Sequence, residues 1–310
     1  MLATVLLLLV IASVTWYYTR STRNPVVVRF AVEMNTHSSA FWVALDKGWF
    51  EQEGVVLEYR VFSTGVELSA ALTRGDVDVA LACIGPLLVA RDRGVPLKLI
   101  AMMHNHGYAV VVNPQSIKHV LDLDGKKIAT SGPGTPTWLL LMLLKDKYGV
   151  KVEPIRMEPF TAMTALRTGQ VEAAILPEHY ATLAESMGLR VLARSQDIWQ
   201  SMPGSGIAVT ERFLNEHREL VTKIVKVLSR AVEFVKTHSS EAAQIIAKYL
   251  DSDPAIVEKS ISNMHFDTRI DLGELQRYID YLVKYGAIEN TVKATEFADT
   301  SILEGIGLAE

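Results

Sequence analysis

Cysteine is almost absent from this chain, since Cys83 is the only one in 310 residues. A single thiol excludes an internal disulfide and a cysteine-rich zinc site. An excess of basic charge is absent too: the chain has 31 Lys and Arg against 35 Asp and Glu, and its net charge is −4 at pH 7. The composition therefore argues against a nucleic-acid partner.

Three common catalytic motifs are also missing. The glycine-rich stretch SGPGTPT (Ser131–Thr137) is not followed by Gly-Lys-Ser/Thr, so it is not a nucleotide-binding P-loop. Neither Gly-x-Ser-x-Gly nor His-Glu-x-x-His occurs, which leaves no hydrolase signature. We expect the chain not to be an enzyme, and to have no catalytic residue, no cofactor and no bound metal.

The first residues form a long apolar segment. Leu2–Tyr18 is an uncharged stretch of 17 residues, and Arg20 and Arg23 follow it. Two interpretations stay open: a cleaved secretory signal, or a retained membrane anchor with Trp16–Tyr18 at the interface. The two arginines by themselves favour a cytoplasmic position for the chain that follows. We assign residues 1–24 to this signal or anchor.

Two segments 94 residues apart resemble each other. Residues 70–80 read AALTRGDVDVA, and residues 164–174 read TALRTGQVEAA. Both halves are expected to contain, in order, a strand, a small polar loop, an apolar helix, a strand, a helix, a glycine and a strand. This shared order favours the duplication of one α/β unit.

Short apolar runs bounded by turn residues predict ten strands. They are Val26–Val32, Val56–Val61, Val77–Ala82, Leu97–Met103, Ala109–Val112, Lys127–Thr130, Val152–Met157, Ala173–Leu176, Arg190–Ala193 and Gly206–Val209. Helices are expected at Phe41–Trp49, Val66–Arg74, Trp138–Tyr148 and Thr161–Thr168, and again over 211–250, after Pro254 and over 271–285. The alternation predicts an α/β fold of two lobes, each a mostly parallel sheet flanked by helices, with a helical C-terminal extension.

Polar residues follow the predicted strand ends, where open α/β sheets bind their ligands. The loops are 35–39, 63–65, 83–86, 104–107, 131–137, 160–163 and 177–180. The loop at Ser131 leads into an apolar helix, so its free backbone N–H groups and the helix dipole would favour a bound anion. The alternative interpretation of these residues is N-capping of the helix together with a tight turn.

Four segments together resemble a known protein family. They are SSAFWVALDKGWFEQEG (38–54), TGVELSAALTRGDVDVAL (64–81), DLDGKKIATSGPGT (122–135) and ALRTGQVEAAILPEHYAT (165–182). They are similar to the nitrate, sulfonate and taurine group of solute-binding proteins of ABC importers, which also includes binders of thiamine-precursor pyrimidines. The resemblance implies a two-lobed periplasmic-binding-protein fold of type II. It also implies an extracytoplasmic location, in the periplasm or on the outer face of the cell membrane.

The same resemblance implies a domain division, partners and ligand contacts. Lobe 1 would comprise residues 25–109, lobe 2 residues 110–206, and residues 207–310 would return to lobe 1 with C-terminal helices. The partners would be a small-molecule ligand, an ABC permease and its ATPase, and the membrane if the N-terminal segment is retained. The implied ligand contacts are Asn35, Thr36, His37, Ser38, Trp42, Ser63, Thr64, His104, His106, Ser131, Thr135, Glu178, His179 and Tyr180.

The class of ligand stays open at this point. Partly protonated histidines would suit an anion such as an aliphatic sulfonate, whereas Glu178 would suit an amine or an aminopyrimidine. No arginine occurs in a predicted cleft loop, and the cysteine-rich motif of the pyrimidine-synthesising relatives is absent. Two further hypotheses are a membrane-tethered sensor and a metal-dependent enzyme on the same fold. The metal ligands of such an enzyme would be His104, His106, Glu178 and His179.

Overall fold

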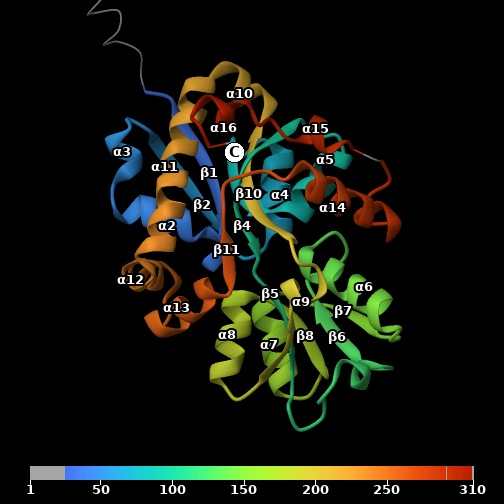
Figure 1. The fold of residues 1–310 in the computed structure, drawn as a ribbon. Coiled ribbons are helices and arrows are strands. Elements are labelled where there is room, and N and C mark those ends of the chain that lie inside the picture. Colours follow the sequence, from blue (N-terminus) through green and yellow to red (C-terminus); the bar gives the residue numbers. More distant parts are fainter. Residues whose placement is uncertain (1–24, 291, 309–310) are drawn as a thin grey trace, which may run out of the picture.

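Two β-sheets flanked by helices lie end to end in the computed structural model of the chain (Figure 1), which describes residues 25–290 and 292–308. The segment assigned above to a signal or anchor, residues 1–24, lies outside the described residues. Within the described ranges, no helix combines the length and the apolar character that crossing a membrane requires.

The first sheet and the helices around it are called lobe 1. Its strand order is β11-β4-β10-β3-β1-β2, and its strands are β1 Val27–Glu33, β2 Val56–Phe62, β3 Val79–Cys83, β4 Leu97–His106, β10 Pro203–Thr210 and β11 Met264–Phe266. The helices in the first part of this lobe are η1 Thr36–Ser38, α2 Ser39–Asp46, α3 Trp49–Gln52, α4 Gly65–Arg74 and α5 Ile84–Asp92. Helix α2 packs on one face of the sheet, and α4 and α5 pack on the other.

The second sheet and its helices are called lobe 2. Its strand order is β7-β6-β8-β5-β9, and its strands are β5 Tyr108–Val112, β6 Lys127–Thr130, β7 Glu153–Arg156, β8 Ala173–Pro177 and β9 Arg190–Arg194. Its helices are η2 Val120–Leu123, α6 Pro136–Tyr148, α7 Pro159–Arg167, α8 Glu178–Ser186 and α9 Ser195–Ile198. All ten predicted strands are present, each with both ends within three residues of the expected bounds.

The two sheets share one topology. Read from β2, the first sheet runs β2-β1-β3-β10-β4, and read from β7 the second runs β7-β6-β8-β5-β9. Each strand of the first series has its counterpart at the same place in the second. The order of elements that the sequence repeats is therefore found twice in the fold, as expected for a duplicated α/β unit.

One strand in each series runs against its neighbours. Strand β5 pairs antiparallel with β8 and β9, and β10 pairs antiparallel with β3 and β4. These are the two strands that enter a lobe from the other one, so they start at the gap between the lobes, where the parallel strands end. The expected sheets are mostly parallel in strand direction, but each contains this reversed strand.

The chain first passes between the lobes at His106, the last residue of β4, and at Gly107, which separates β4 from β5. Both residues have a positive φ, 65° for His106 and 93° for Gly107. A Cβ on Gly107 would also lie 2.8 Å from Nε2 of His37. Glycine is therefore required here for two reasons, its backbone conformation and the close approach of an imidazole ring.

The C-terminal third is helical, as the sequence predicts. Its helices are α10 Glu211–Glu216, α11 Arg218–Thr237, α12 Ser239–Leu250, α13 Pro254–Ser262, α14 Leu272–Lys284, α15 Ala294–Phe297 and α16 Ser301–Gly305. They pack mainly on lobe 1 (Figure 1). Two of them also reach lobe 2: Lys259 of α13 pairs with Glu185 of α8 at 3.1 Å, and Lys284 of α14 pairs with Asp146 of α6 at 2.5 Å.

One helix prediction is wrong in its extent. The expected helix Phe41–Trp49 is interrupted at Gly48, whose φ is 64°, and it forms the two helices α2 and α3. The left-handed conformation at Gly48 ends α2 and turns the chain, because glycine adopts this conformation without a steric penalty.

Candidate binding site between the two lobes

A small cavity lies between the lobes, at the ends of strands β1, β3 and β8. It is lined by Glu33, Asn35, Ser63, Thr64, Gly65, Val66, Cys83, Pro86, Tyr108, Ser131, Thr135, Pro136, Thr137, Pro159 and Pro177. Its volume is about 30 Å³, which is room for about one or two water molecules. Larger openings of about 400 Å³ and about 270 Å³ adjoin it and share Val66 and Ser131 with it. The two lobes are thus in contact over the innermost part of the cleft.

Five helices begin at this cavity. Thr64 is the N-cap of α4, Thr135 is the N-cap of α6, and Pro159 is the first residue of α7. Cys83 and Pro177 immediately precede α5 and α8. Each of these residues lines the cavity. Because a helix N-terminus carries unpaired N–H groups and a partial positive charge, the cavity wall favours negative charge.

The loop at Ser131 is built around the start of α6. The hydroxyl of Thr135 donates to the carbonyl of Gly132 at 2.6 Å and accepts from the N–H of Trp138 at 3.3 Å. The Thr137 hydroxyl accepts from the N–H of Ser131 at 3.0 Å. These hydroxyls therefore stabilise the start of α6 and the loop before it, and the same residues also line the cavity. The two interpretations of this loop do not exclude each other.

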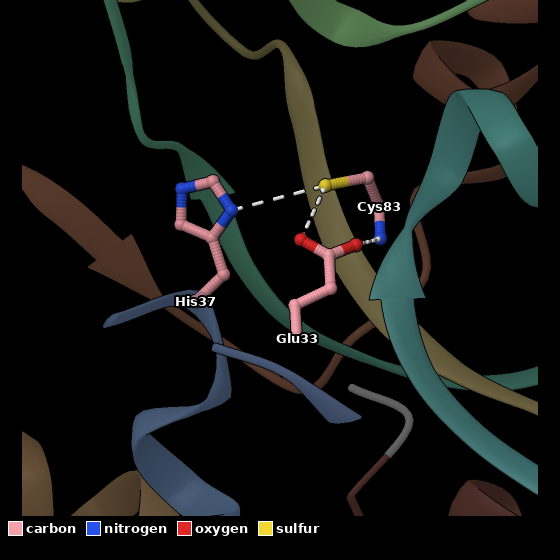
Figure 2. Close-up of side chains that lie close together, drawn as sticks. All are labelled: Glu33, His37 and Cys83. Carbon is pink, nitrogen blue, oxygen red and sulfur yellow. Dashed lines mark hydrogen bonds between the residues drawn. The ribbon is translucent and has the colours of Figure 1, made fainter. Parts of the chain in front are cut away.

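The floor of the cavity is a buried cluster of Glu33, His37 and Cys83 (Figure 2). Their relative exposures are 2%, 1% and 6%. The thiol of Cys83 donates to Oε2 of Glu33 at 3.2 Å, and its sulfur lies 3.8 Å from Nδ1 of His37. The backbone N–H of Cys83 donates to Oε1 of Glu33 at 3.0 Å, and the hydroxyl of Tyr108 donates to the sulfur at 3.1 Å.

Burial sets the protonation of this cluster. Desolvation raises the pKa of the Cys83 thiol well above its usual value, and the nearby Glu33 carboxylate raises it further. Desolvation also lowers the pKa of the His37 imidazole. At neutral pH the cluster therefore holds a protonated thiol and an uncharged imidazole. Its arrangement is that of a thiol, an imidazole and a carboxylate gathered around one point.

Five of the sequence-derived contact residues line the cavity: Asn35, Ser63, Thr64, Ser131 and Thr135. The other nine lie behind its wall or elsewhere. His37 is in the floor cluster, and His104 packs against it with the rings tilted and their centroids 4.6 Å apart. His106 lines a separate opening of about 580 Å³ beside the segments that join the lobes.

Three residues of the η1–α2 segment face the interior of lobe 1. The hydroxyl of Thr36 lies 2.8 Å from that of Ser260, and Ser38 is fully buried. The Trp42 ring stacks on Tyr249, with centroids 5.0 Å apart. None of the three is among the residues that line the cavity, so their contribution in this structure is to packing.

The residues at the start of α8 are turned toward other partners. Glu178 accepts from Arg194 at 3.2 Å and from Asn263 at 2.8 Å, and desolvation raises its pKa. His179 is buried, and desolvation lowers its pKa to about 4. Tyr180 packs edge-on against the His179 ring. These three side chains therefore lie beside the cavity rather than in its wall.

The hypothetical metal set of His104, His106, Glu178 and His179 is not assembled. In the described parts of the chain, the only group of three or more His, Cys, Asp or Glu side chains close enough to share an ion is Glu33, His37 and Cys83. The single cysteine, which the sequence excludes from a cysteine-rich zinc site, lies between an imidazole and a carboxylate.

Sequence reasoning missed several residues of the site. Glu33, Cys83 and Tyr108 line the cavity but are not among the expected contacts, although Cys83 lies in the expected loop 83–86. Glu33 went unnoticed because it ends an apolar strand. Arg156 was missed as well: it ends β7 and lines both openings that adjoin the cavity. No predicted cleft loop contains an arginine, because Arg156 lies within the predicted strand Val152–Met157. Glu33, Cys83 and Arg156 each end an observed strand, and Tyr108 begins β5. A place at the cleft end of a strand was therefore the signal that could have found them.

Two duplicated α/β lobes that meet over a cavity at their strand ends define a two-lobed binding protein of the periplasmic type. A family model described as "NMT1/THI5 like" matches residues 35–242. The chain belongs to this family.

Known relatives and solved structures agree with this class. The chain is 26% identical to a putative aliphatic sulfonates-binding protein of Bacillus subtilis (strain 168), over 86% of this chain and 84% of the relative. It is 30% identical to a putative binding protein of Brucella abortus (strain 2308), over 76% of this chain and 75% of the relative. The alkanesulfonate-binding protein SsuA from Xanthomonas axonopodis pv. citri, solved with MOPS bound, has the same fold, with a TM-score of 0.80, 20% identity, and 90% of this chain and 100% of that chain covered.

Proposed function

We propose that this chain is the substrate-binding component of an ABC importer and captures a small organic anion, such as an aliphatic sulfonate, between its lobes. The observation that carries the proposal is the convergence of five helix N-termini on one cavity. Each N-terminus offers backbone N–H donors and partial positive charge to a bound oxyanion. Hydroxyls of Ser63, Thr64 and Ser131 add polar groups in the same wall.

The proposed mechanism is capture by closure. The innermost cavity of about 30 Å³ is too small for an organic solute, so the lobes must separate for binding and close again around the guest. Bound solute stabilises the closed state by the contacts that it makes to both lobes at once. The closed form is then what a permease would recognise, and the chain itself needs no chemical step.

The proposed location is extracytoplasmic, with an ABC permease and its ATPase as partners. The apolar N-terminal segment supports export, either as a signal or as an anchor. The relatives named for sulfonate binding support the same class of solute.

A second candidate ligand is a heterocycle or amine with N–H donors, such as a thiamine-precursor pyrimidine. The carboxylate of Glu33 in the cavity floor favours it, since carboxylates accept hydrogen bonds from such groups. The five helix N-termini favour the anion, so the anion remains the leading proposal.

A thermal-shift screen of the full chain tests the proposal. We expect a rise in the melting temperature with alkanesulfonates or taurine, and none with neutral amino acids or pyrimidines, because binding to the folded state alone stabilises it. A shift with pyrimidines alone would instead favour the second candidate. A cooperatively folded protein that no small solute stabilises would contradict solute capture altogether.

A further inference from the structure

Glu33, His37 and Cys83 bring three different metal-binding atoms together from three segments of lobe 1. They come from the end of β1, from η1 and from the end of β3. The Cys83 sulfur is 3.2 Å from Oε2 of Glu33 and 3.8 Å from Nδ1 of His37, and the three ligand atoms all lie within 4.8 Å of one another. In a tetrahedral zinc site, a sulfur and a nitrogen or oxygen ligand are about 3.5 Å apart. The two distances from the Cys83 sulfur are close to that value.

The His37 ring is already oriented as a ligand. Its Nε2 lies 2.9 Å from the carbonyl oxygen of Gly107, and a carbonyl only accepts hydrogen bonds, so Nε2 carries the proton. The lone pair is then on Nδ1, the atom that points toward Cys83 (Figure 2). Metal-binding histidines commonly donate their other N–H to a backbone carbonyl in this way.

The other two donors are supported in the same manner. Asn35 Nδ2 donates to Oε2 of Glu33 at 3.1 Å, and the hydroxyl of Tyr108 donates to the sulfur of Cys83 at 3.1 Å. A hydrogen-bond donor to the sulfur stabilises a thiolate, and a fixed carboxylate is a better ligand than a mobile one. Each of the three ligands therefore has an outer partner that holds it in place.

The cluster leaves the Glu33 carboxylate with neutral partners. Its hydrogen-bond donors are the Asn35 amide, the Cys83 backbone N–H and the Cys83 thiol. Burial of a carboxylate at 2% exposure is costly; the partial positive charge at the start of α5 offsets that cost only in part, and a full positive charge is missing among the described hydrogen-bond partners of Glu33. A divalent cation at the centre of the cluster would supply that charge.

We propose that Glu33, His37 and Cys83 bind one divalent transition-metal ion, with Zn²⁺ as the best match to this set of a thiolate, an imidazole and a carboxylate. On binding, the S–H bond of Cys83 breaks, its proton leaves to solvent, and a sulfur–metal bond forms. Three protein ligands leave one tetrahedral position vacant. Because Glu33 and Cys83 line the interlobe cavity, water or a solute oxygen reaches that position from the cleft.

The metal would also change the charge of the cavity floor. Exchange of one proton for a divalent ion adds one positive charge beside the five helix N-termini. An anionic solute would then meet a metal ion as well as N–H donors. All three ligands belong to lobe 1, so metal binding needs neither the solute nor closure and does not rest on the proposed function.

Cobalt titration tests this site. The full chain, reduced and freed of metal by a chelator, is titrated anaerobically with Co²⁺. We expect one ion per chain, a thiolate-to-cobalt charge-transfer absorption, tetrahedral d–d bands, and displacement by Zn²⁺ with a dissociation constant below about 1 µM. Cys83→Ser and His37→Gln should abolish the charge-transfer band or weaken binding at least tenfold. His265→Gln, a change at an exposed histidine, should leave both unchanged.

Three results would overturn the metal site. They are no charge-transfer band in the wild-type chain, cobalt bound without such a band, and equal affinity in Cys83→Ser. Anomalous diffraction at the zinc edge from wild-type crystals locates the ion independently of any variant that fails to fold. If the metal binds but the solute screen fails, the proposed function is contradicted and the metal site stands. If a solute raises the melting temperature but no metal binds, the metal site is contradicted and the proposed function stands.

Discussion

Gly85 of α5 and Gly134 of the loop before α6 meet backbone to backbone across the cleft. A Cβ added to Gly85 would lie 2.3 Å from the carbonyl oxygen of Gly134 and 2.9 Å from the hydroxyl of Tyr278. A side chain at Gly85 cannot lie 2.3 Å from a backbone oxygen unless the backbone moves. Gly85 belongs to lobe 1 and Gly134 to lobe 2, so the closed arrangement of the lobes depends on the absence of a methyl group at this point.

Gly85→Ala is therefore expected to hinder closure. The variant should fold normally with its lobes further apart, and its affinity for an alkanesulfonate or taurine should fall at least tenfold, or about 1.4 kcal/mol. Calorimetric titration of wild type and variant measures the change. Gly305→Ala is the matched control, since a Cβ there has no neighbour within 4 Å. Equal affinities for wild type and Gly85→Ala would show that binding does not use this closed state.

Thr135→Val should lower stability more than affinity. The hydroxyl of Thr135 caps α6 and donates to Gly132, and loss of such a cap lowers the free energy of unfolding by about 1 kcal/mol. Thr135→Ser keeps the hydroxyl and should restore the stability. Urea unfolding measures the first effect, and calorimetry measures affinity. If Thr135→Val abolishes solute binding while stability is unchanged, the hydroxyl is a direct ligand contact instead of a cap.

Stability should fall as the pH is lowered below the usual pKa of histidine. Burial lowers the pKa of His179 from 6.5 to about 4 in the folded state. Between these values the unfolded chain binds more protons than the folded chain, so the free energy of unfolding rises with pH. From pH 7 to pH 4 this single group accounts for a loss of up to about 3 kcal/mol.

His179→Gln should reduce the change in the free energy of unfolding per pH unit. Thermal unfolding at intervals from pH 7 to pH 4 compares this variant with the wild type, and His265→Gln serves as an exposed control. A wild-type stability that is flat over this range, or a slope that His179→Gln leaves intact, would contradict a buried neutral imidazole at this position.

The hydrogen bond between Asn263 and Glu178 should contribute more to the free energy of unfolding than the nearby ion pair between Lys259 and Glu185. Asn263 Nδ2 donates to the buried Glu178 carboxylate at 2.8 Å and connects the end of α13 to lobe 2. Loss of a hydrogen bond to a buried charged group costs about 1–2 kcal/mol, and it should also favour the open form. Lys259→Ala removes the more exposed pair with Glu185, a change expected to cost less than about 1 kcal/mol.

Denaturant unfolding of Asn263→Ala and Lys259→Ala ranks the two contacts. Solute affinity should follow the same order, because only the first contact holds a buried group of lobe 2 against the C-terminal helices. If Lys259→Ala is the more destabilising change, exposed charge rather than buried hydrogen bonding holds the lobes together.

Much of the fold could be predicted because its signals are local. Short apolar runs bounded by turn residues mark ten of the eleven strands in the described residues. N-caps and helix-ending glycines mark most helices, and the repeated order of elements marks the two lobes. Strand β11 was missed because it has three residues, MHF, and pairs only at the edge of the sheet. The reversed direction of β5 and β10 comes from the passage of the chain between lobes, which no local pattern records.

The site was less accessible to sequence reasoning. Several segments that follow predicted strands contain residues that line the cavity, although residues 84–86, 160–163 and 178–180 lie in the helices α5, α7 and α8 rather than in loops. Which side chains turn into the cavity depends on packing. Trp42 lies close in sequence to the predicted cleft loop 35–39, yet its ring stacks on Tyr249, more than two hundred positions away. Glu33 and Cys83 are separated by 50 residues, so their hydrogen bond appears only when β1 and β3 pair.

A crystal structure of the full chain with the solute that gives the largest thermal shift tests the central claim most directly. We expect the solute between the lobes, with its anionic group at the N-termini of α4 and α6 and its contacts shared by Thr64 and Ser131. A solute bound instead in the opening beside His106 and Gln200, or lobes that do not enclose it, would contradict the account.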